Sequence, residues 1–196
     1  MIQRHMVRFI FVLLAGLALG QHAQPIEVHD VEGNPWSLLA PTANQLDLLF
    51  FVSADCPISN RYAPEIKRVC DDYRARGVRC FAVYPDAAAD QAAVNQHRLE
   101  YGFDRTIPAI VDRNHRLVGV AGPRVTPEAA IYSSKGRVYR GRIDDLYIDV
   151  GRARREATHH DVRLALDAAL AGRSIPRPET EAVGCFIQTL SPEEHR

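Results

Sequence analysis

The sequence predicts an α/β domain in which helices flank a central mixed sheet. Residues 47–52 and 78–84 form two almost wholly apolar runs that end at turn formers, as the buried strands of a mostly parallel sheet do. Between these runs, residues 57–76 carry apolar side chains at intervals of three and four, which is one face of an amphipathic helix. Gly77 follows, where a glycine commonly ends a helix.

Shorter elements complete the predicted domain. A second helix is expected over residues 89–101, and a final helix ends at Leu170. Thr158 and Asp161 have the spacing of a capping box, so Thr158 is the expected N-cap of the final helix. An N-terminal hairpin, a single strand and a second hairpin are expected at residues 26–28, 36–38, 109–111, 129–132 and 138–143. The core is expected to contain Leu38, Leu48, Phe50, Val52, Ile66, Phe81, Val83, Ile110 and Ile131.

The two ends of the chain are expected to lie outside this domain, which spans residues 25–172. Residues 1–20 combine a positively charged start with an apolar stretch and a small residue, Gly20, which is typical of a secretory signal peptide. The alternative is a retained N-terminal anchor. Residues 173–196 have no periodicity and predict an irregular tail that carries Cys185.

Composition limits the compartment and the partners. A cleaved signal predicts an exported protein, most simply in a bacterial periplasm where disulfides persist, without stable membrane insertion after cleavage. The chain has 24 basic and 24 acidic residues and a formal net charge of zero. It therefore offers no electrostatic attraction to nucleic acid or to an anionic membrane surface.

Cys56 carries the main functional signal. It follows the first buried strand and precedes Pro57, and proline is favoured at the first position of a helix. Cys56 is therefore expected at a helix N-terminus, at the carboxyl end of a central strand. The partial positive charge there favours the thiolate, which is the nucleophilic form of cysteine. The alternative is that Cys56 is a small buried hydrophobe without chemistry.

The element order and three motifs resemble the thioredoxin-fold redoxin superfamily, of the alkyl hydroperoxide reductase / thiol-specific antioxidant type. The motifs are Asp55-Cys56-Pro57, Ile-Pro-Ala-Ile-Val-Asp at residues 107–112, and Thr126-Pro127. The resemblance covers residues 25–172. It implies a thioredoxin-like fold and a thiol oxidoreductase in which Cys56 attacks a peroxide or a protein disulfide. It also implies that Pro127 is a cis-proline facing Cys56, supported by Thr126.

The chain departs from the family patterns near Cys56. Ser59 stands where thioredoxins carry the second cysteine of Cys-x-x-Cys, so a dithiol cycle within this loop is excluded. Leu49 and Ser53 stand where peroxiredoxins carry proline and threonine, which argues against the usual peroxidase loop. Arg124 is the best-placed cation to lower the pKa of Cys56, whereas the adjacent Asp55 would raise it.

The other three cysteines have different expected roles. Cys70 lies about 21 Å along the helix from Cys56, so these two cannot pair. Cys70 and Cys80 are near the distance limit for a disulfide, and two packed thiols are preferred over a bond. The resemblance implies that Cys185 resolves the oxidised Cys56, as a C-terminal cysteine does in several redoxins. A free or buried thiol in the tail is the alternative for Cys185.

A metal-binding function is the second hypothesis. Copper chaperones with a thioredoxin fold hold copper with cysteines and a histidine, and Cys56, Cys185 and His160 offer such a soft set. His159 is an alternative third ligand. Those chaperones carry Cys-x-x-x-Cys, whereas this chain has Asn60 in place of the second cysteine.

A third hypothesis is a binding domain with an inert Cys56. The preferred function is a thiol oxidoreductase without a cofactor, served by a reducing thiol protein or a small thiol.

Overall fold

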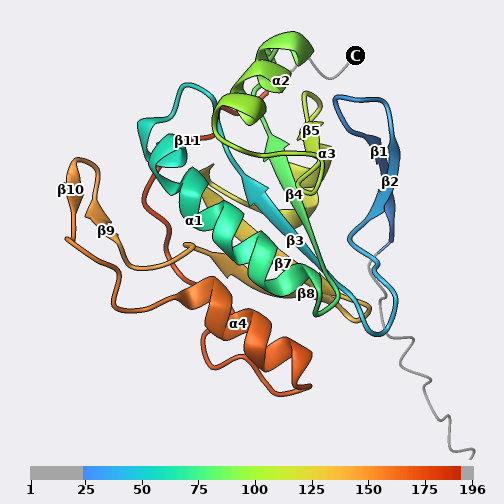
Figure 1. Ribbon diagram of the computed structural model, residues 1–196, viewed down its shortest axis with the longest axis vertical. Helices are drawn as coiled ribbons and strands as arrows, with labels where there is room; N and C mark the ends of the chain where they lie inside the picture. Colours follow the sequence, from blue (N-terminus) through green and yellow to red (C-terminus); the bar gives the residue numbers. More distant parts are fainter. Residues whose placement is uncertain (1–23, 191–196) are drawn as a thin grey trace, which may run out of the picture.

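A five-stranded mixed sheet forms the centre of the protein in the computed structural model, which describes residues 24–190 (Figure 1). The strand order is β5-β4-β3-β7-β8. Strands β3, β4 and β5 are parallel to one another, whereas β7 pairs antiparallel with β3 and β8 pairs antiparallel with β7. Their bounds are Leu46–Phe51 for β3, Val78–Tyr84 for β4, Ala109–Val111 for β5, Glu128–Ser133 for β7 and Gly136–Gly141 for β8. The predicted fold class is confirmed.

Helices and a hairpin cover the two faces of this sheet. Leu48 and Phe50 of β3 pack into the core shared with α1 (Pro57–Arg74) and α4 (Asp161–Leu170). Leu49 and Phe51 face the other core, which α3 (Arg116–Ala121) and the β1–β2 hairpin cover. Strand β3 is apolar throughout because both of its faces are buried. The remaining bounds are Ile26–His29 for β1, Pro35–Leu38 for β2 and Gln91–Glu100 for α2.

The expected core is confirmed residue by residue. No member of the expected set is more than 1% exposed: Leu38, Leu48, Phe50, Val52, Ile66, Phe81, Val83, Ile110 and Ile131. These residues divide between the two faces of the sheet, so the apolar runs supply both cores.

The predicted capping box is wrong. Helix α4 begins at Asp161 with His160 at its N-cap, and no side chain caps it. Thr158 instead donates from its hydroxyl and its backbone N–H to the two carboxylate oxygens of Asp145, both at 2.6 Å. A carboxylate is a strong hydrogen-bond acceptor, so Thr158 acts as a donor to Asp145 and its hydroxyl does not accept an N–H of the first turn of α4.

Several short elements were not expected from the sequence. They are α3, the hairpin of β9 (Tyr147–Asp149) and β10 (Arg152–Ala153), and the pair β6 (Val125–Thr126) and β11 (Cys185–Phe186). The predicted signal peptide, residues 1–20, and the end of the tail, residues 191–196, lie outside the described residues. Within the part of the chain that is described, no helix is long and apolar enough to cross a membrane.

Candidate functional site

Cys56 lies where strand β3 gives way to helix α1. It is the N-cap of α1, with extended backbone angles, and Pro57 is the first helical residue. The Cys56 side chain is 1% exposed. The backbone N–H of Cys56 donates to the carbonyl of Ser53 at 3.3 Å, which closes a tight turn between strand and helix. The position expected for Cys56 is therefore confirmed.

The first turn of α1 fixes the loop that precedes Cys56. The Ser59 hydroxyl accepts a hydrogen bond from the backbone N–H of Ser53 at 3.3 Å. The side-chain amide of Asn60 donates to the carbonyl of Ala54 at 3.0 Å. Ser59 and Asn60 occupy the places of the second cysteine in Cys-x-x-Cys and Cys-x-x-x-Cys, and here they hold the loop instead.

A chain of polar side chains extends from this loop, where Asn60 is half-buried, to the buried His97 and Tyr84. Because the Asn60 amide nitrogen faces Ala54, its oxygen faces His97 Nε2 at 2.9 Å, and Nε2 must carry the proton. Burial lowers the pKa of His97, so the ring is neutral and Nδ1 accepts from the Tyr84 hydroxyl at 2.9 Å. The chain Tyr84–His97–Asn60 links β4 and α2 to α1. No motif or residue spacing in the sequence indicated this chain of hydrogen bonds.

Cys56 and Cys185 form a disulfide across 129 positions of sequence, with their Cα atoms 6.1 Å apart. Cys185 is half-buried, whereas Cys56 lies beneath it. Figure 1 shows the tail, in red, running from α4 back to the start of α1. The structure thus brings together the two cysteines that the resemblance paired, and their catalytic roles remain predictions.

The tail reaches Cys56 by pairing with the chain just before Pro127. Strand β11 runs antiparallel to β6, with Cys185 opposite Thr126. The Cys56 Sγ lies 3.0 Å from the Thr126 carbonyl oxygen. The peptide bond between Thr126 and Pro127 is cis, as the resemblance implied. Thr126, Pro127 and both cysteines therefore converge at one point.

The tail is also fastened farther back, along β8. The Arg140 N–H donates to the carbonyl of Pro178 at 2.9 Å, and the Thr180 N–H donates to the carbonyl of Arg140 at 3.1 Å. Gly141 has a φ of +147°, and a Cβ there would collide with Thr180. Backbone hydrogen bonds therefore hold the tail on the domain independently of the disulfide.

Gly184 is a functional residue that the sequence reading missed. A Cβ at this position would lie 2.7 Å from the carbonyl carbon of Thr126 and 3.2 Å from the nitrogen of Pro127. Both neighbours are backbone atoms and cannot move aside cheaply. Only glycine lets the tail approach the Thr126 carbonyl closely enough for Cys185 to meet Cys56.

Glu128 is a second missed residue. It follows Pro127, is 4% exposed, and accepts hydrogen bonds from the backbone N–H groups of Arg124 at 2.7 Å and Val125 at 3.3 Å. Burial raises the pKa of Glu128, and these two N–H groups and the charge of Arg140 oppose the rise. The carboxylate fixes the β6 segment on which the tail docks. The available signal was a charged residue between Pro127 and the apolar strand predicted over residues 129–132.

The Arg124 side chain is exposed and makes no described contact with Cys56. The Arg124 backbone serves the tail, because its carbonyl accepts the N–H of Ile187 at 3.0 Å. That the Arg124 guanidinium lowers the pKa of Cys56 therefore remains a prediction, which no described contact supports.

The remaining cysteines form no bond. Cys70 and Cys80 are both buried free thiols, as the preferred expectation had it. Burial, together with the neighbouring Cys80, raises the pKa of Cys70 well above its ordinary value. A buried thiol is inaccessible to a substrate, so Cys70 and Cys80 serve the core.

The copper hypothesis finds no assembled site in the described residues. His160 is exposed at the start of α4, and His159 interacts with Asp145. Across residues 24–190, no three or more His, Cys, Asp and Glu side chains are grouped so as to hold a metal ion. The two cysteines are engaged with each other.

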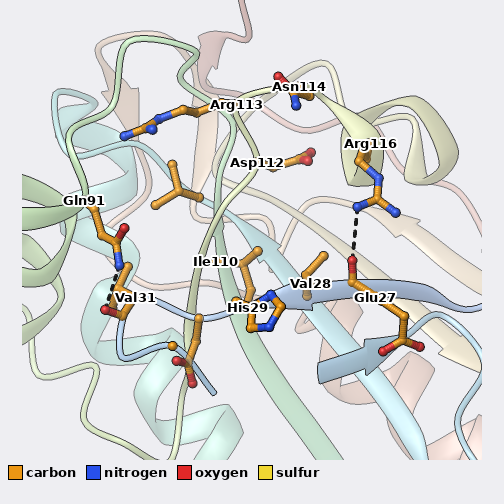
Figure 2. Close-up of a pocket in the computed structure, with 13 residues that line it drawn as sticks. Glu27, Val28, His29, Val31, Gln91, Ile110, Asp112, Arg113, Asn114 and Arg116 are labelled. Carbon is orange, nitrogen blue, oxygen red and sulfur yellow. Dashed lines mark hydrogen bonds between the residues drawn. The ribbon is translucent and has the colours of Figure 1, made fainter. Parts of the chain in front are cut away.

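Two cavities flank the docked tail, and a third lies elsewhere. One of about 270 Å³ is lined by Cys185, Phe186 and Ser53, but not by Cys56. One of about 650 Å³ is lined by Phe186 and Val150, among others. Figure 2 shows the third, of about 410 Å³, between β1 and the segment after β5; neither Cys56 nor Cys185 lines it. The space accessible from the disulfide is therefore beside Cys185.

The AhpC/TSA family matches residues 19–140, more than half of the chain. The chain belongs to the AhpC/TSA family. This membership confirms the resemblance and supports thiol oxidoreductase activity. Cys185 lies beyond the matched residues. No curated protein matches the chain.

Solved structures share the fold. An uncharacterized conserved protein from Geobacillus kaustophilus is 24% identical, with a TM-score of 0.73 over 88% of this chain and 92% of its own. A hypothetical protein from Sinorhizobium meliloti 1021 is 25% identical, with a TM-score of 0.73 over 89% of this chain and 96% of its own. A candidate thioredoxin from Neisseria meningitidis is 19% identical, with a TM-score of 0.52 over 60% and 77%. These similarities confirm the thioredoxin-like fold.

Proposed function

We propose that this AhpC/TSA protein is an exported thiol oxidoreductase whose redox pair is Cys56 and Cys185. Cys56 is the nucleophile, and Cys185 resolves the intermediate that it forms. The observation that carries the proposal is the pairing of β11 with β6, which holds Cys185 against Cys56 although 129 positions separate them. The tail thus supplies the second thiol that Ser59 does not.

The reaction proceeds in two thiol steps. With a protein disulfide, the Cys56 thiolate attacks one sulfur, forms a mixed disulfide and releases the other sulfur as a thiolate. Cys185 then attacks Cys56 Sγ, which forms the Cys56–Cys185 disulfide and releases the reduced substrate. With a peroxide, the Cys56 thiolate attacks one oxygen, the O–O bond breaks, the second oxygen leaves as an alcohol or as water, and Cys56 becomes a sulfenic acid. The Cys185 thiol then attacks Cys56 Sγ, which forms the disulfide and releases the sulfenic oxygen as water. Either route moves two electrons from the cysteine pair to the substrate.

A protein disulfide is the favoured substrate. Leu49 and Ser53 replace the proline and threonine of the peroxiredoxin loop, and no described contact brings a guanidinium to Cys56. The helix N-terminus at Cys56 supplies the positive potential that the thiolate needs. Export to the periplasm is proposed from the signal-like residues 1–20, and a reducing thiol partner follows from the need to regenerate the pair.

The test uses the reduced full chain with two oxidants, insulin as a disulfide-bonded protein and hydrogen peroxide. Intact-mass and peptide mapping under non-reducing conditions should show a Cys56–Cys185 disulfide that dithiothreitol removes. Cys56→Ser should abolish turnover, and Cys185→Ser should leave a trapped adduct on Cys56. Cys80→Ala is the control and should retain turnover.

Two outcomes contradict this function. Turnover that survives Cys56→Ser shows that the chemistry lies elsewhere. Thiols that stay reduced in the presence of both oxidants, while copper co-purifies, favour the copper hypothesis.

A further inference from the structure

His97 is a buried titratable side chain that the two thiol steps do not use. It lies on α2 and is 8% exposed, and its ring stacks on Tyr101 with 4.5 Å between the ring centroids. The two ring nitrogens form hydrogen bonds of 2.9 Å, Nε2 with the Asn60 side chain and Nδ1 with the Tyr84 hydroxyl. These three neighbours fix both the position and the orientation of the ring.

Asn60 connects this ring to the loop directly before Cys56. Its side-chain amide has a donor end and an acceptor end. The Ala54 carbonyl, 3.0 Å away, needs the donor end, and the Nε2–H of His97 needs the acceptor end. Because the Tyr84 hydroxyl donates to Nδ1, the proton of the neutral ring stays on Nε2. His97 therefore keeps the amide turned with its nitrogen toward the loop.

The loop before Cys56 decides how the Cys56 sulfur meets the end of α1. Cys56 is the N-cap of this helix, and its carbonyl accepts the N–H of Asn60 at 3.0 Å, which closes the first turn. The stabilisation that a helix terminus gives to a negative charge falls off within one turn. A thiolate at the N-cap is therefore sensitive to small shifts of the chain just before it. The Asn60 amide holds that chain, and α2 holds the amide.

We propose that His97 is a positioning residue for the thiol chemistry: through Asn60, it holds the loop so that the terminus of α1 stabilises the Cys56 thiolate. This rests on the proposed function, in which Cys56 is the nucleophile. No described contact joins His97 to the Cys56 sulfur, and its influence runs from Nε2 through Asn60 to the Ala54 carbonyl, two residues before Cys56. The donor on Nε2 carries this role, and Nδ1 serves to keep the proton there.

Two substitutions separate the roles of the two ring nitrogens. His97→Gln places an amide N–H near the position of Nε2 and can still donate to Asn60. His97→Asn is one carbon shorter and keeps a polar atom only near the position of Nδ1. Both new side chains are uncharged amides, so neither titrates. The reduced full chain is alkylated with iodoacetamide between pH 5 and pH 10, and the rate at Cys56 is read by peptide mapping.

The midpoint of this pH profile reports how well the site stabilises the Cys56 thiolate. In His97→Asn the midpoint should move to higher pH, with a rate about threefold below the wild type on the acidic side and convergence at high pH. His97→Gln should keep the wild-type midpoint. Asn60→Ala breaks the same path at its other end, so it should move the midpoint as far as His97→Asn does, and the double variant should move it no farther.

Val94→Ala is the control for lost stability. Val94 is 3% exposed on α2, and its apolar side chain takes no part in the chain of hydrogen bonds, so the midpoint should not move. A wild-type midpoint in both His97→Asn and Asn60→Ala overturns the proposal. An equal displacement in His97→Gln, His97→Asn and Val94→Ala also overturns it, because the role is then merely structural. Alkylation is read without turnover, so either result is separate from the turnover test with Cys56→Ser.

Discussion

Two structural features surround Cys56, one local in the sequence and one distant. The N-terminus of α1 stabilises negative charge at Cys56, and the Thr126 carbonyl oxygen lies 3.0 Å from its Sγ on the other side of the site. The helix position was predictable, because an apolar run followed by Cys56-Pro57 is a local pattern. The carbonyl was not, because it arrives from 70 positions away in the chain.

Gly184 gives the sharpest test at the level of single residues. Gly184→Ala should prevent the tail from docking, because the new Cβ would meet the backbone at Thr126 and Pro127. We expect disulfide formation by the reduced protein to slow at least tenfold, with Cys56 open to alkylation, as measured by mass spectrometry. Gly119→Ala is the control: nothing lies within 4 Å of its Cβ, and a helical alanine should stabilise by up to about 1 kcal/mol. Equal rates in both variants would show that the tail docks differently.

Glu128 predicts a pH dependence. Burial raises its pKa above the ordinary 4.5, so the folded protein holds this proton more tightly than the unfolded chain. Its contribution to stability is therefore complete below about pH 4.5 and is lost as pH rises through the raised pKa. Glu128→Gln keeps an acceptor for the N–H groups of Arg124 and Val125 but cannot titrate.

The measurement is the free energy of unfolding in urea between pH 4 and pH 8. Relative to the wild type, Glu128→Gln should gain stability as pH rises across this window. A difference between the two proteins that does not change with pH would mean that Glu128 keeps an ordinary pKa. Glu181→Gln serves as control, because that glutamate is exposed.

Among the secondary-structure elements, those with strong local signals were predicted well. Strand β4 was expected over the residues where it lies, 78–84, because Gly77 and Pro85 bound its apolar run. Helix α3 was missed because six residues are too few for a periodic pattern, and its N-cap His115 has a left-handed φ of 51°. Strands β6 and β11 were missed because each has two residues and exists only by pairing with the other.

Helices α1 and α2 are coupled through Asn60 and His97, which gives a prediction at the level of elements. Asn60→Ala leaves His97 Nε2 without its acceptor and frees the Ala54 carbonyl. The free energy of unfolding should fall by about 1–3 kcal/mol. Alkylation of reduced Cys56 by iodoacetamide should also change in rate, since the loop before it loses its anchor. Gln96→Ala, on the exposed face of α2, should change neither quantity.

At the level of the whole molecule, the tail completes the site. The AhpC/TSA match ends at residue 140, before α4 and the tail, yet half of the proposed redox pair lies at position 185. The family resemblance, together with the exclusion of a Cys56–Cys70 pair, predicted Cys185 as the partner of Cys56. The path of the tail over the domain to Cys56 could not be predicted from the sequence, because the contacts along β8 and β6 join segments about 40 to 60 positions apart.

The Cys56–Cys185 bond should contribute to stability through the length of chain it encloses. Cross-linking residues 129 positions apart removes conformational freedom from the unfolded chain, worth about 3–5 kcal/mol in the chain-entropy view. Dithiothreitol should therefore lower the free energy of unfolding in urea by about that amount. Cys185→Ser should behave like the reduced protein and be insensitive to dithiothreitol. A wild-type protein with equal stability in both redox states would show that the tail constrains the unfolded chain little. The docked segment at residues 178–187 would then hold the tail through backbone hydrogen bonds alone.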